Sequence, residues 1–582
     1  MSALLKKVAS FRPAQKLRSS VGLLGSGSVS DESQDALLAR LGLQPQFKRD
    51  FDFLVSFGIS FCIISPLTGI GAGLSTAWNN SGPAAAIYGW KLVSLFSLFI
   101  GLSMAEIVSG LPSAGGPYFW SSWLGGRHSP FLSWITGWFN LMGQVATTAS
   151  VAASGMFVLV NILQLLCKIT LTQPEQLAVY LGILLVSGAV NSCPSTWLGQ
   201  SIAFGTFINI AGVIFVVLLL TSVAPWHQPA KFVWATFFGK DMSPNNAPND
   251  VYLFCQGCLM STFVFLGYDS CGHISEETRG ADSSAPYAIV SSIVVSAVVG
   301  YVLLLGLLFS IQDPSILTSL DSEAQGYAPG QLMWDVFKAR YGRGDFCAIP
   351  LSIFFLACVM CTISSLTANS RMIFAFARDN GIPFSSFFRT VSTRMHSPIR
   401  SLWLSVAIAF ALGLPLLVST VAFTAVVSIA SIGLQVSYGI PILCRLTYSR
   451  TSFIRGPFHL GRYSAFIGWT SIVYITLSAV NFSLPPTYPV TLAGFNFTPL
   501  AVGLVCGGCI LTWWLPKYGA RYWYLGPKLA VEHAATERAR ALKYKSLKSS
   551  KSKSKKVPVR SLAECESFDS FDHRRSPALH QT

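Results

Sequence analysis

An aspartate and two glycines interrupt one of the apolar stretches of the chain. Residues 263–277 read FVFLGYDSCGHISEE, and Asp269 stands between Gly267 and Gly272. A carboxylate at membrane depth is costly, so it is a functional candidate by default. Burial favours its neutral form and a nearby ammonium favours its charged form, so Asp269 could exchange a proton as an amine substrate comes and goes. The alternative is a structural role, as a helix cap or as a partner of a hydroxyl such as Ser270.

A second interruption lies in the first apolar stretch. Residues 57–80 read FGISFCIISPLTGIGAGLSTAWNN and contain Pro66 followed by Gly69, Gly71 and Gly73. A helix in lipid must satisfy its own backbone, so a break is tolerated only where it is buried in protein or lines a cavity. The alternative for Gly69 and Gly73 is close helix packing, because they form a GxxxG pattern.

Two interrupted spans separated by five others indicate two inverted repeats of five helices with a binding site at their interface. The free N–H groups of a half-helix suit a substrate α-carboxylate, and free carbonyls suit its ammonium. We expect the carboxylate at the first interruption and the ammonium at the second. The predicted substrate-binding residues from these two segments are Thr68, Gly69, Ile70, Gly71, Ala72, Gly73, Phe265, Leu266 and Gly267.

Three further polar positions bear on ion coupling. Ser364, Ser365 and Thr367 in the stretch 347–376 could supply the oxygen ligands that a sodium ion requires. His273 is expected where the interrupted span opens to cytosolic water, and Glu106 is expected to have a structural role near the cytosolic boundary. The coupling ion stays open between H⁺ and Na⁺, with the proton preferred because of Asp269.

The composition requires membrane-spanning helices to position these residues. The 582 residues are 52% hydrophobic and 11% charged, with a mean hydropathy of +0.52, whereas soluble domains carry about 25% charged residues. The sequence therefore predicts an all-α membrane protein with about twelve spans, of which the first and sixth are discontinuous. The twelve apolar segments are 52–78, 84–109, 131–165, 176–193, 200–224, 251–271, 286–312, 347–376, 401–418, 420–444, 464–484 and 497–516. The pair at 401–444 could instead be one long kinked helix.

The net charge of +16 follows membrane orientation rather than a nucleic-acid partner. All but seven of the 41 lysines and arginines fall on one predicted side, which places both termini in the cytosol. We expect a cytosolic N-terminal tail over 1–50, a transporter domain over 51–517 and a basic cytosolic tail over 518–582. The last tail is predicted to be solvated and disordered, with contact to anionic lipid as the alternative. The plasma membrane is the expected location, and vacuolar or mitochondrial membranes are alternatives.

Several function classes are excluded or disfavoured by the residues. An intramembrane enzyme needs a cluster of acid, base or nucleophile groups at depth, and the sequence shows no such cluster. A GxxxxGK[ST] loop for ATP is absent from the sequence. The cysteine pairs at 255/258, 358/361 and 506/509 are interpreted as helix-packing residues, so no metal site or cofactor is expected.

At this point the sequence resembles the amino acid/choline and GABA permease branch of the amino acid–polyamine–organocation superfamily. The resemblance covers about residues 35–520. The matching motifs are SPLTGI (65–70), SGP and YGWKLVS (81–94), GLSMAEIVSGLPSAGGPYFW (101–120), SWITGWFNLMGQ (133–144), FLGYDSCGHISEET (265–278) and FAFARDNGIPFS (374–385).

This resemblance implies a LeuT-like fold of ten core helices plus two, which moves amino acids or related amines by alternating access. It assigns an aromatic gate to Phe263 and a proton-linked acid to Asp269. A lysine that replaces sodium in some relatives is missing from the fifth span, where Asn209 is the most polar mid-span residue apart from hydroxyls. Neutral amino acids, GABA, choline and polyamines all stay possible as substrates. The alternative from another class is a receptor that binds an amino acid without moving it.

Overall fold

The described part of the chain is helical. The computed structural model describes residues 49–528 apart from 241–242, 244, 246–247, 393, 418–419 and 491–494, together with residues 38, 39, 41, 43, 47 and 531. These residues form helices, turns and one isolated bridge between Phe51 and Thr278. Most of the two predicted tails lies outside the described residues.

The helices follow one another along the chain. The elements that matter below are α3 (Phe53–Ile64), α4 (Pro66–Ser81), α5 (Trp90–Gly110), α6 (Pro117–Leu124), α7 (Ser129–Cys167), α8 (Gln173–Asn191), α9 (Ser195–Val223), α10 (Ala230–Ala235), α11 (Asp250–Val264), α12 (Ser270–His273), α13 (Ala281–Phe309), α14 (Ala328–Tyr341), α15 (Ala348–Arg378), α16 (Ser385–Phe388), α17 (Ile399–Gly413), α18 (Thr420–Leu446), α19 (Ser464–Ser483) and α20 (Thr498–Trp514). The longer connections precede α11, α14, α19 and α20.

Each of the twelve predicted apolar segments coincides with a helix or with an interrupted pair of helices. Within the described ranges, nine helical stretches are long and apolar enough to cross a membrane, and α11 and α20 are shorter apolar helices. The chain is thus an all-helical, multi-pass membrane protein, and the twelve-span count with its inverted repeat stays a prediction. Residues 401–444 form two helices, α17 and α18, rather than one long kinked helix.

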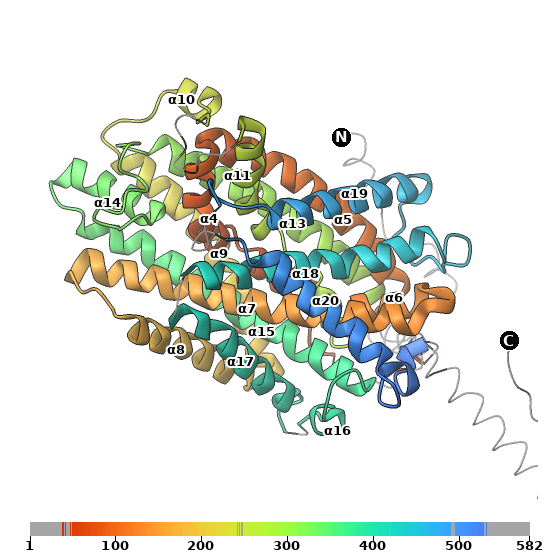
Figure 1. The fold of residues 1–582 in the computed structure, drawn as a ribbon. Helices are drawn as coiled ribbons and strands as arrows, with labels where there is room; N and C mark the ends of the chain where they lie inside the picture. The colour runs from red at the N-terminus through yellow and green to blue at the C-terminus, as the bar shows by residue number, and fades with distance from the viewer. Residues whose placement is uncertain are drawn as a thin grey trace, which may run out of the picture. The chain divides into compact units, whose positions relative to one another are not determined.

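The packing brings the two interrupted spans to the middle of the helices. Helix α4 packs against α11, α13 packs against α3 and α5, and α7 packs against both α15 and α18. Figure 1 places α10 and α14 at one end of these helices and α6 and α16 at the other. We call these the α14 end and the α16 end.

Polar side chains set where several helices begin. Asp52 accepts a hydrogen bond from the Val55 amide at 3.0 Å at the start of α3. Asn249 accepts one from the Tyr252 amide at 2.8 Å at the start of α11. Such caps satisfy amides that have no partner in the first helical turn. They fix the ends of the two spans that carry the interruptions.

Candidate functional site

The first interruption is a single residue. Ser65 has φ 26° and ψ 90°, and it separates α3 from α4. Its hydroxyl accepts a hydrogen bond from the Thr68 amide at 3.3 Å and donates one to Asn209 Oδ1 of α9 at 2.7 Å. Pro66 follows as the first residue of α4, where its missing N–H costs nothing. The buried break is therefore stabilised by its own serine and by Asn209.

The three glycines lie after this break and not in it. Gly69, Gly71 and Gly73 are helical residues of α4, so the amides of Ile70 to Gly73 belong to the helix and are not free at its start. The sequence-based placement of a carboxylate on those amides is therefore wrong in position. The physical reason is Pro66, which ends the preceding helix at Ser65 and starts the next one.

Gly69 and Gly73 instead allow α4 to approach α11. A Cβ on Gly69 would lie 2.3 Å from Val264 Cγ2, and a Cβ on Gly73 would lie 2.5 Å from Met260 Cγ. Gly71 faces another helix, since its Cβ would lie 2.8 Å from Phe354 Cδ1 of α15. Gly69 and Gly73 thus serve close helix packing, as the GxxxG alternative predicted.

The second interruption is longer and lies where the sequence placed it. Helix α11 ends at Val264 and α12 begins at Ser270, with Phe265 capping the end of α11. Gly267 has φ +79°, a conformation that side chains rarely adopt. Its amide donates to the Tyr438 hydroxyl of α18 at 3.2 Å. The backbone between the two helices is therefore held from a distant helix.

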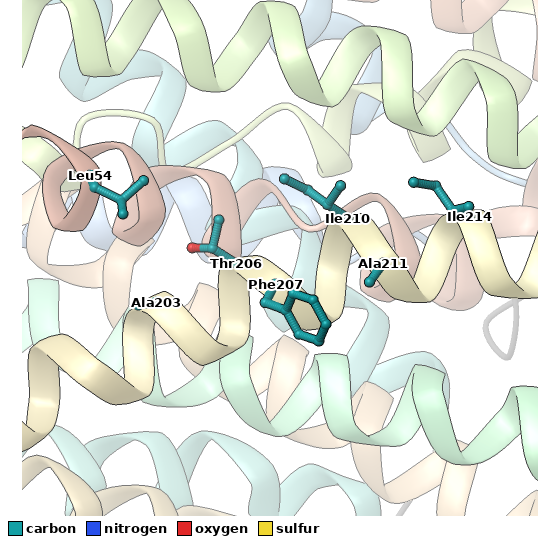
Figure 2. Close-up of a pocket in the computed structure, with 7 residues that line it drawn as sticks. All are labelled: Leu54, Ala203, Thr206, Phe207, Ile210, Ala211 and Ile214. Atoms are coloured by element: carbon teal, nitrogen blue, oxygen red, sulfur yellow. The ribbon is translucent and has the colours of Figure 1, made fainter.

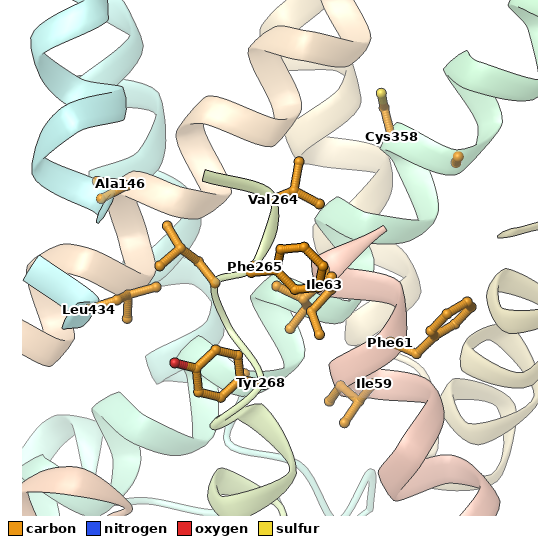
Figure 3. Close-up of a cluster of buried hydrophobic side chains, with 14 of the residues drawn as sticks. Ile59, Phe61, Ile63, Ala146, Val264, Phe265, Tyr268, Cys358 and Leu434 are labelled. Carbon is orange, nitrogen blue, oxygen red and sulfur yellow. The ribbon is translucent and has the colours of Figure 1, made fainter. Parts of the chain in front are cut away.

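The two interruptions lie in contact with each other. A Cβ on Gly267 would lie 2.3 Å from Ile63 Cγ2 of α3. Ser60 of α3 donates to the Tyr268 carbonyl at 3.1 Å and accepts from the Cys271 amide at 3.2 Å. Figure 3 shows Ile63 beside the irregular chain that carries Phe265 and Tyr268. The two broken spans thus face each other and not only lipid.

Asp269 is the centre of a buried hydrogen-bond network. Its side chain is fully buried, and Tyr438 donates to Oδ1 at 2.7 Å. Oδ2 accepts from Gln144 Nε2 at 3.0 Å and from Asn140 Nδ2 at 3.3 Å, and it lies 3.3 Å from His273 Nε2. Asp269 does not cap α12 through its side chain. Asp269 therefore neither caps a helix through its side chain nor bonds to Ser270, so the alternative role considered from the sequence is wrong.

Three of these partners were missed in the sequence. Asn140 and Gln144 lie one helical turn apart in α7, and Tyr438 lies in α18. Asn140 and Gln144 could have been found from the sequence, because two amide side chains four positions apart inside an apolar span lie on one helix face. Their carbonyl oxygens, Asn140 Oδ1 and Gln144 Oε1, are buried, and no described residue donates a hydrogen bond to them.

His273 and Glu106 are two further ionisable groups that the sequence singled out. His273 is fully buried and its Nδ1 lies 2.9 Å from the Ala114 carbonyl, so its expected exposure to water is wrong. Glu106 is buried, accepts from the Leu460 amide at 3.3 Å, and accepts from the Ser464 hydroxyl. Glu106 thus bonds to a backbone amide, as expected of a structural partner, and its role stays a prediction.

The three hydroxyls predicted for a sodium site do not converge. Ser365 lies 2.6 Å from the Thr148 hydroxyl of α7, whereas Thr367 donates to Asn191 Oδ1 of α8 at 2.7 Å. Ser364 faces the Cys62 side of α3. Successive helix positions point about 100° apart, so these hydroxyls reach three different neighbours. The shared ion site proposed from the sequence is therefore not formed by this set.

The remaining predicted site residues differ in exposure. Thr68, Ile70, Phe265 and Leu266 are buried, and Phe265 packs on Trp90 with ring centroids 4.8 Å apart. Phe263 is partly buried, and Ala72 is exposed. The aromatic gate that the resemblance assigns to Phe263 stays a prediction.

Buried ion pairs close the α16 end. Arg371 Nε of α15 lies 2.8 Å from Glu277 Oε1, with both side chains at most 2% exposed. Arg378 Nη1 lies 3.0 Å from Glu276 Oε2. Glu276 Oε1 also accepts from the Ala114 amide at 3.1 Å. These contacts join α15, the chain after α12 and the loop before α6.

Neutral hydrogen bonds close the α14 end. Ser75 of α4 donates to the Gly326 carbonyl at 3.1 Å and accepts from the Ala328 amide at 3.1 Å. Asn161 Nδ2 of α7 donates to the Ala324 carbonyl at 3.1 Å. The segment from residue 312 through α14, which we call the α14 segment, is thus attached to α4 and α7.

Two acidic residues of the α14 segment titrate differently. Burial raises the pKa of Asp335 from 3.8 to about 6, although Gln331 donates to its Oδ1 at 2.8 Å. A hydrogen bond from Lys338, 2.6 Å long, lowers the pKa of Glu323 to about 2. Asp335 Oδ2 is buried and accepts no hydrogen bond from the part of the chain that the structure describes.

A surface groove lies apart from this network. Figure 2 shows it along α9 beside the start of α3. Phe207 and Ile214 are more than half exposed, as is Leu54. The lining residues are Leu54, Ala203, Thr206, Phe207, Ile210, Ala211 and Ile214, none of which is a predicted site residue. Its apolar lining is typical of a lipid-facing surface.

Comparison with known proteins shows to which family the chain belongs. Residues 51–506 match the family model described as amino acid permease. The chain is 40% identical to an amino-acid permease BAT1 homolog of Oryza sativa subsp. japonica, over 84% of this chain and 95% of that protein. It is 37% identical to amino-acid permease BAT1 of Arabidopsis thaliana, over 87% and 99% of the two chains. A GABA-specific permease of Saccharomyces cerevisiae is 30% identical over 79% of this chain and 81% of its own length. The chain therefore belongs to the amino acid permease family, whose members are transporters and not enzymes.

Proposed function

We propose that this protein is a secondary active transporter that moves amino acids or related amines across a membrane by alternating access, coupled to protons. The observation that carries the proposal is the contact between two interrupted membrane helices beside the buried Asp269. Family membership supports transport of amino acids, and the yeast relative supports including GABA among the compounds tested.

The second interruption is suited to a substrate ammonium. Asn140 and Gln144 direct their N–H₂ groups to Asp269, which leaves two buried carbonyl oxygens without donors. An ammonium carries three donors and no acceptor. It would satisfy these oxygens and add a positive charge beside the carboxylate.

The substrate carboxylate is proposed at the start of α4. The Leu67 amide belongs to the first turn, and Thr68 is capped by Ser65. A helix N-terminus carries partial positive charge and suits an anion. The sequence-based site over Thr68 to Gly73 is thereby narrowed to the first turn of α4, and Gly69 and Gly73 are assigned to packing.

Protons are favoured over sodium as the coupling ion. Asp269 is a buried titratable group next to the proposed ammonium position, and the three hydroxyls considered for sodium point to different helices. The receptor alternative has no supporting observation in the geometry or among the relatives. We place the α16 end and both termini in the cytosol and expect the plasma membrane as the location.

Uptake into proteoliposomes tests this function. A panel of labelled neutral amino acids, GABA, choline and a polyamine is offered with and without sodium and with an inward proton gradient. We expect accumulation of at least one amino acid or amine that needs the proton gradient and not sodium. Binding without uptake would support the receptor alternative, and sodium-dependent accumulation would contradict proton coupling.

Asp269→Asn tests the role of the carboxylate in coupling. The substitution keeps the size of the side chain and removes its ionisable proton. We expect gradient-driven accumulation to fall by about tenfold or more, a loss that corresponds to roughly 1.4 kcal/mol. Surface expression of the variant is the control, and an unchanged pH dependence would remove Asp269 from the coupling step.

A further inference from the structure

His273 and Asp269 are joined in a way that requires a proton between them. Both side chains are fully buried, and His273 Nε2 lies 3.3 Å from Asp269 Oδ2. On the other side of the ring, Nδ1 lies 2.9 Å from the Ala114 carbonyl. A carbonyl only accepts hydrogen bonds, so Nδ1 carries a hydrogen. A neutral imidazole then has a bare Nε2, and an ionised carboxylate has no hydrogen to give it.

The arrangement is therefore satisfied only when one additional proton lies on Nε2 or on Oδ2. Without that proton His273 has a single N–H for two acceptors. It can bond to Asp269 or to Ala114, and the other contact becomes two acceptors facing each other. Loss of the proton must break one of the two contacts.

Among the described residues, His273 is the basic side chain that lies within ion-pair distance of Asp269. Helices α3 and α7 contain no acidic or basic residue, and the titratable groups facing Asp269 from its own segment and from α18 are Tyr268, Cys271 and Tyr438. The basic residues of α15 are already paired, Arg371 with Glu277 and Arg378 with Glu276. The acidic residue of α13, Asp282, lies in its first turn.

Ala114 connects this proton to the closure of the α16 end. Its carbonyl faces His273 Nδ1, while its amide donates to Glu276 Oε1, the carboxylate that pairs with Arg378. Gly116 of the same loop packs so closely on the ring that a Cβ would lie 2.7 Å from His273 Cε1. The loop 113–116 is thus held by His273 and by the buried ion pair together.

We propose that Asp269 and His273 form one shared-proton site, and that its occupancy decides whether the loop 113–116 stays closed at the α16 end. When the site holds the proton, His273 binds both Asp269 and Ala114. When the proton leaves to water, the single N–H of His273 goes to the ionised carboxylate of Asp269, because a charged acceptor forms the stronger hydrogen bond. The loop then loses its contact with His273. This inference rests on the proposed function and identifies His273 as the residue that links the proton to opening.

The transport test uses His273→Gln with His128→Gln as its control. The introduced glutamine amide could bond to both partners without titrating, and His128 is an exposed histidine at the same end. We compare tracer uptake at about pH 5 and about pH 8, on either side of the usual histidine range. We expect uptake at the two pH values to differ by about tenfold for wild type and for H128Q. For H273Q we expect nearly equal uptake at the two pH values. A wild-type ratio in H273Q would overturn the proposal.

A second measurement needs neither uptake nor a variant. Amide hydrogen exchange of residues 113–116 is followed in the wild-type protein in lipid nanodiscs and corrected for the intrinsic effect of pH. We expect exchange to rise by about threefold or more from about pH 5 to about pH 8, with residues 191–195 unchanged as the reference. Equal protection at both pH values would overturn the switch. If the wild type takes up no tracer at all, the proposed function fails and this exchange measurement still decides the switch.

Discussion

The two ends of the bundle are closed by different kinds of interaction. At the α16 end, Arg371 and Glu277 form a dry ion pair, and His273 adds a contact that depends on a proton. At the α14 end, Ser75 and Asn161 hold the α14 segment through neutral hydrogen bonds. Removing one partner of a buried pair costs about 3–5 kcal/mol, whereas a neutral hydrogen bond contributes about 0.5–1.5 kcal/mol.

This difference means that closure of the two ends depends on different interactions. The α16 end is closed only when each buried charge has its partner and the shared proton is bound. The α14 end is closed by several small contributions, and burial raises the pKa of its Asp335 to about 6. In the alternating-access cycle proposed above only one end is open at a time, and closures of different chemistry give each end its own trigger for opening.

The largest effect is expected at the α16 end. Arg371→Met leaves the Glu277 carboxylate buried without its cation and should lower stability by about 3–5 kcal/mol. Unfolding of the purified protein in mixed micelles with increasing SDS measures this loss. The double variant Arg371→Met, Glu277→Leu is the matched control, because it removes both charges. We expect it to recover most of the stability, and a double variant as unstable as the single one would contradict this account.

A smaller effect is expected from Ser75→Ala at the α14 end. The change removes one donated and one accepted hydrogen bond and should cost about 1–3 kcal/mol by the same SDS titration. Ser352→Ala is the control, because Ser352 is an exposed serine whose hydroxyl bonds within its own helix. A loss of stability as large as that of Arg371→Met would show that the two ends do not differ in the strength of their contacts.

The pH response of the α14 end is expected to depend on Asp335. Its pKa is about 6 in the folded protein and 3.8 ordinarily, so the folded state binds the proton more tightly. Stability therefore falls as pH rises through the interval between these values, and above it the buried carboxylate is a constant penalty.

Asp335→Asn removes this titration. Its melting temperature should exceed that of wild type by roughly 2 °C at neutral pH, and the difference should shrink toward zero as the pH falls from about 6 to about 4. Thermal unfolding of both proteins across pH measures it. A difference that is constant with pH would show that Asp335 does not control this end.

The smallest effect is expected from the exposed ion pair of the α14 segment. Lys338 and Glu323 are 53% and 30% exposed, so Lys338→Met should cost at most about 1 kcal/mol. The pKa of Glu323, lowered to about 2, keeps the pair ionised across neutral pH. High salt should remove most of the difference between wild type and variant. A loss that survives high salt would indicate that packing of the lysine stem, and not charge, is responsible.

The sequence by itself determined which apolar segments are helical and which of them are interrupted. Long apolar runs with few charges can satisfy their backbone in lipid only as helices, so the twelve predicted segments coincide with helices. Glycines around Asp269 likewise located the second interruption. The first was located to within a few residues, because Pro66 and not the glycines decides where a helix ends.

Only the tertiary structure decided what surrounds the interruptions. The partners of Asp269 come from α7 and α18, far away along the chain, and His273 is buried by the loop that contains Ala114. The same is true of the hydroxyls at Ser364 to Thr367, whose neighbours lie on three different helices. Hydrogen bonds depend on distance and direction between side chains. When the two groups lie on different helices, composition and spacing determine neither the distance nor the direction between them.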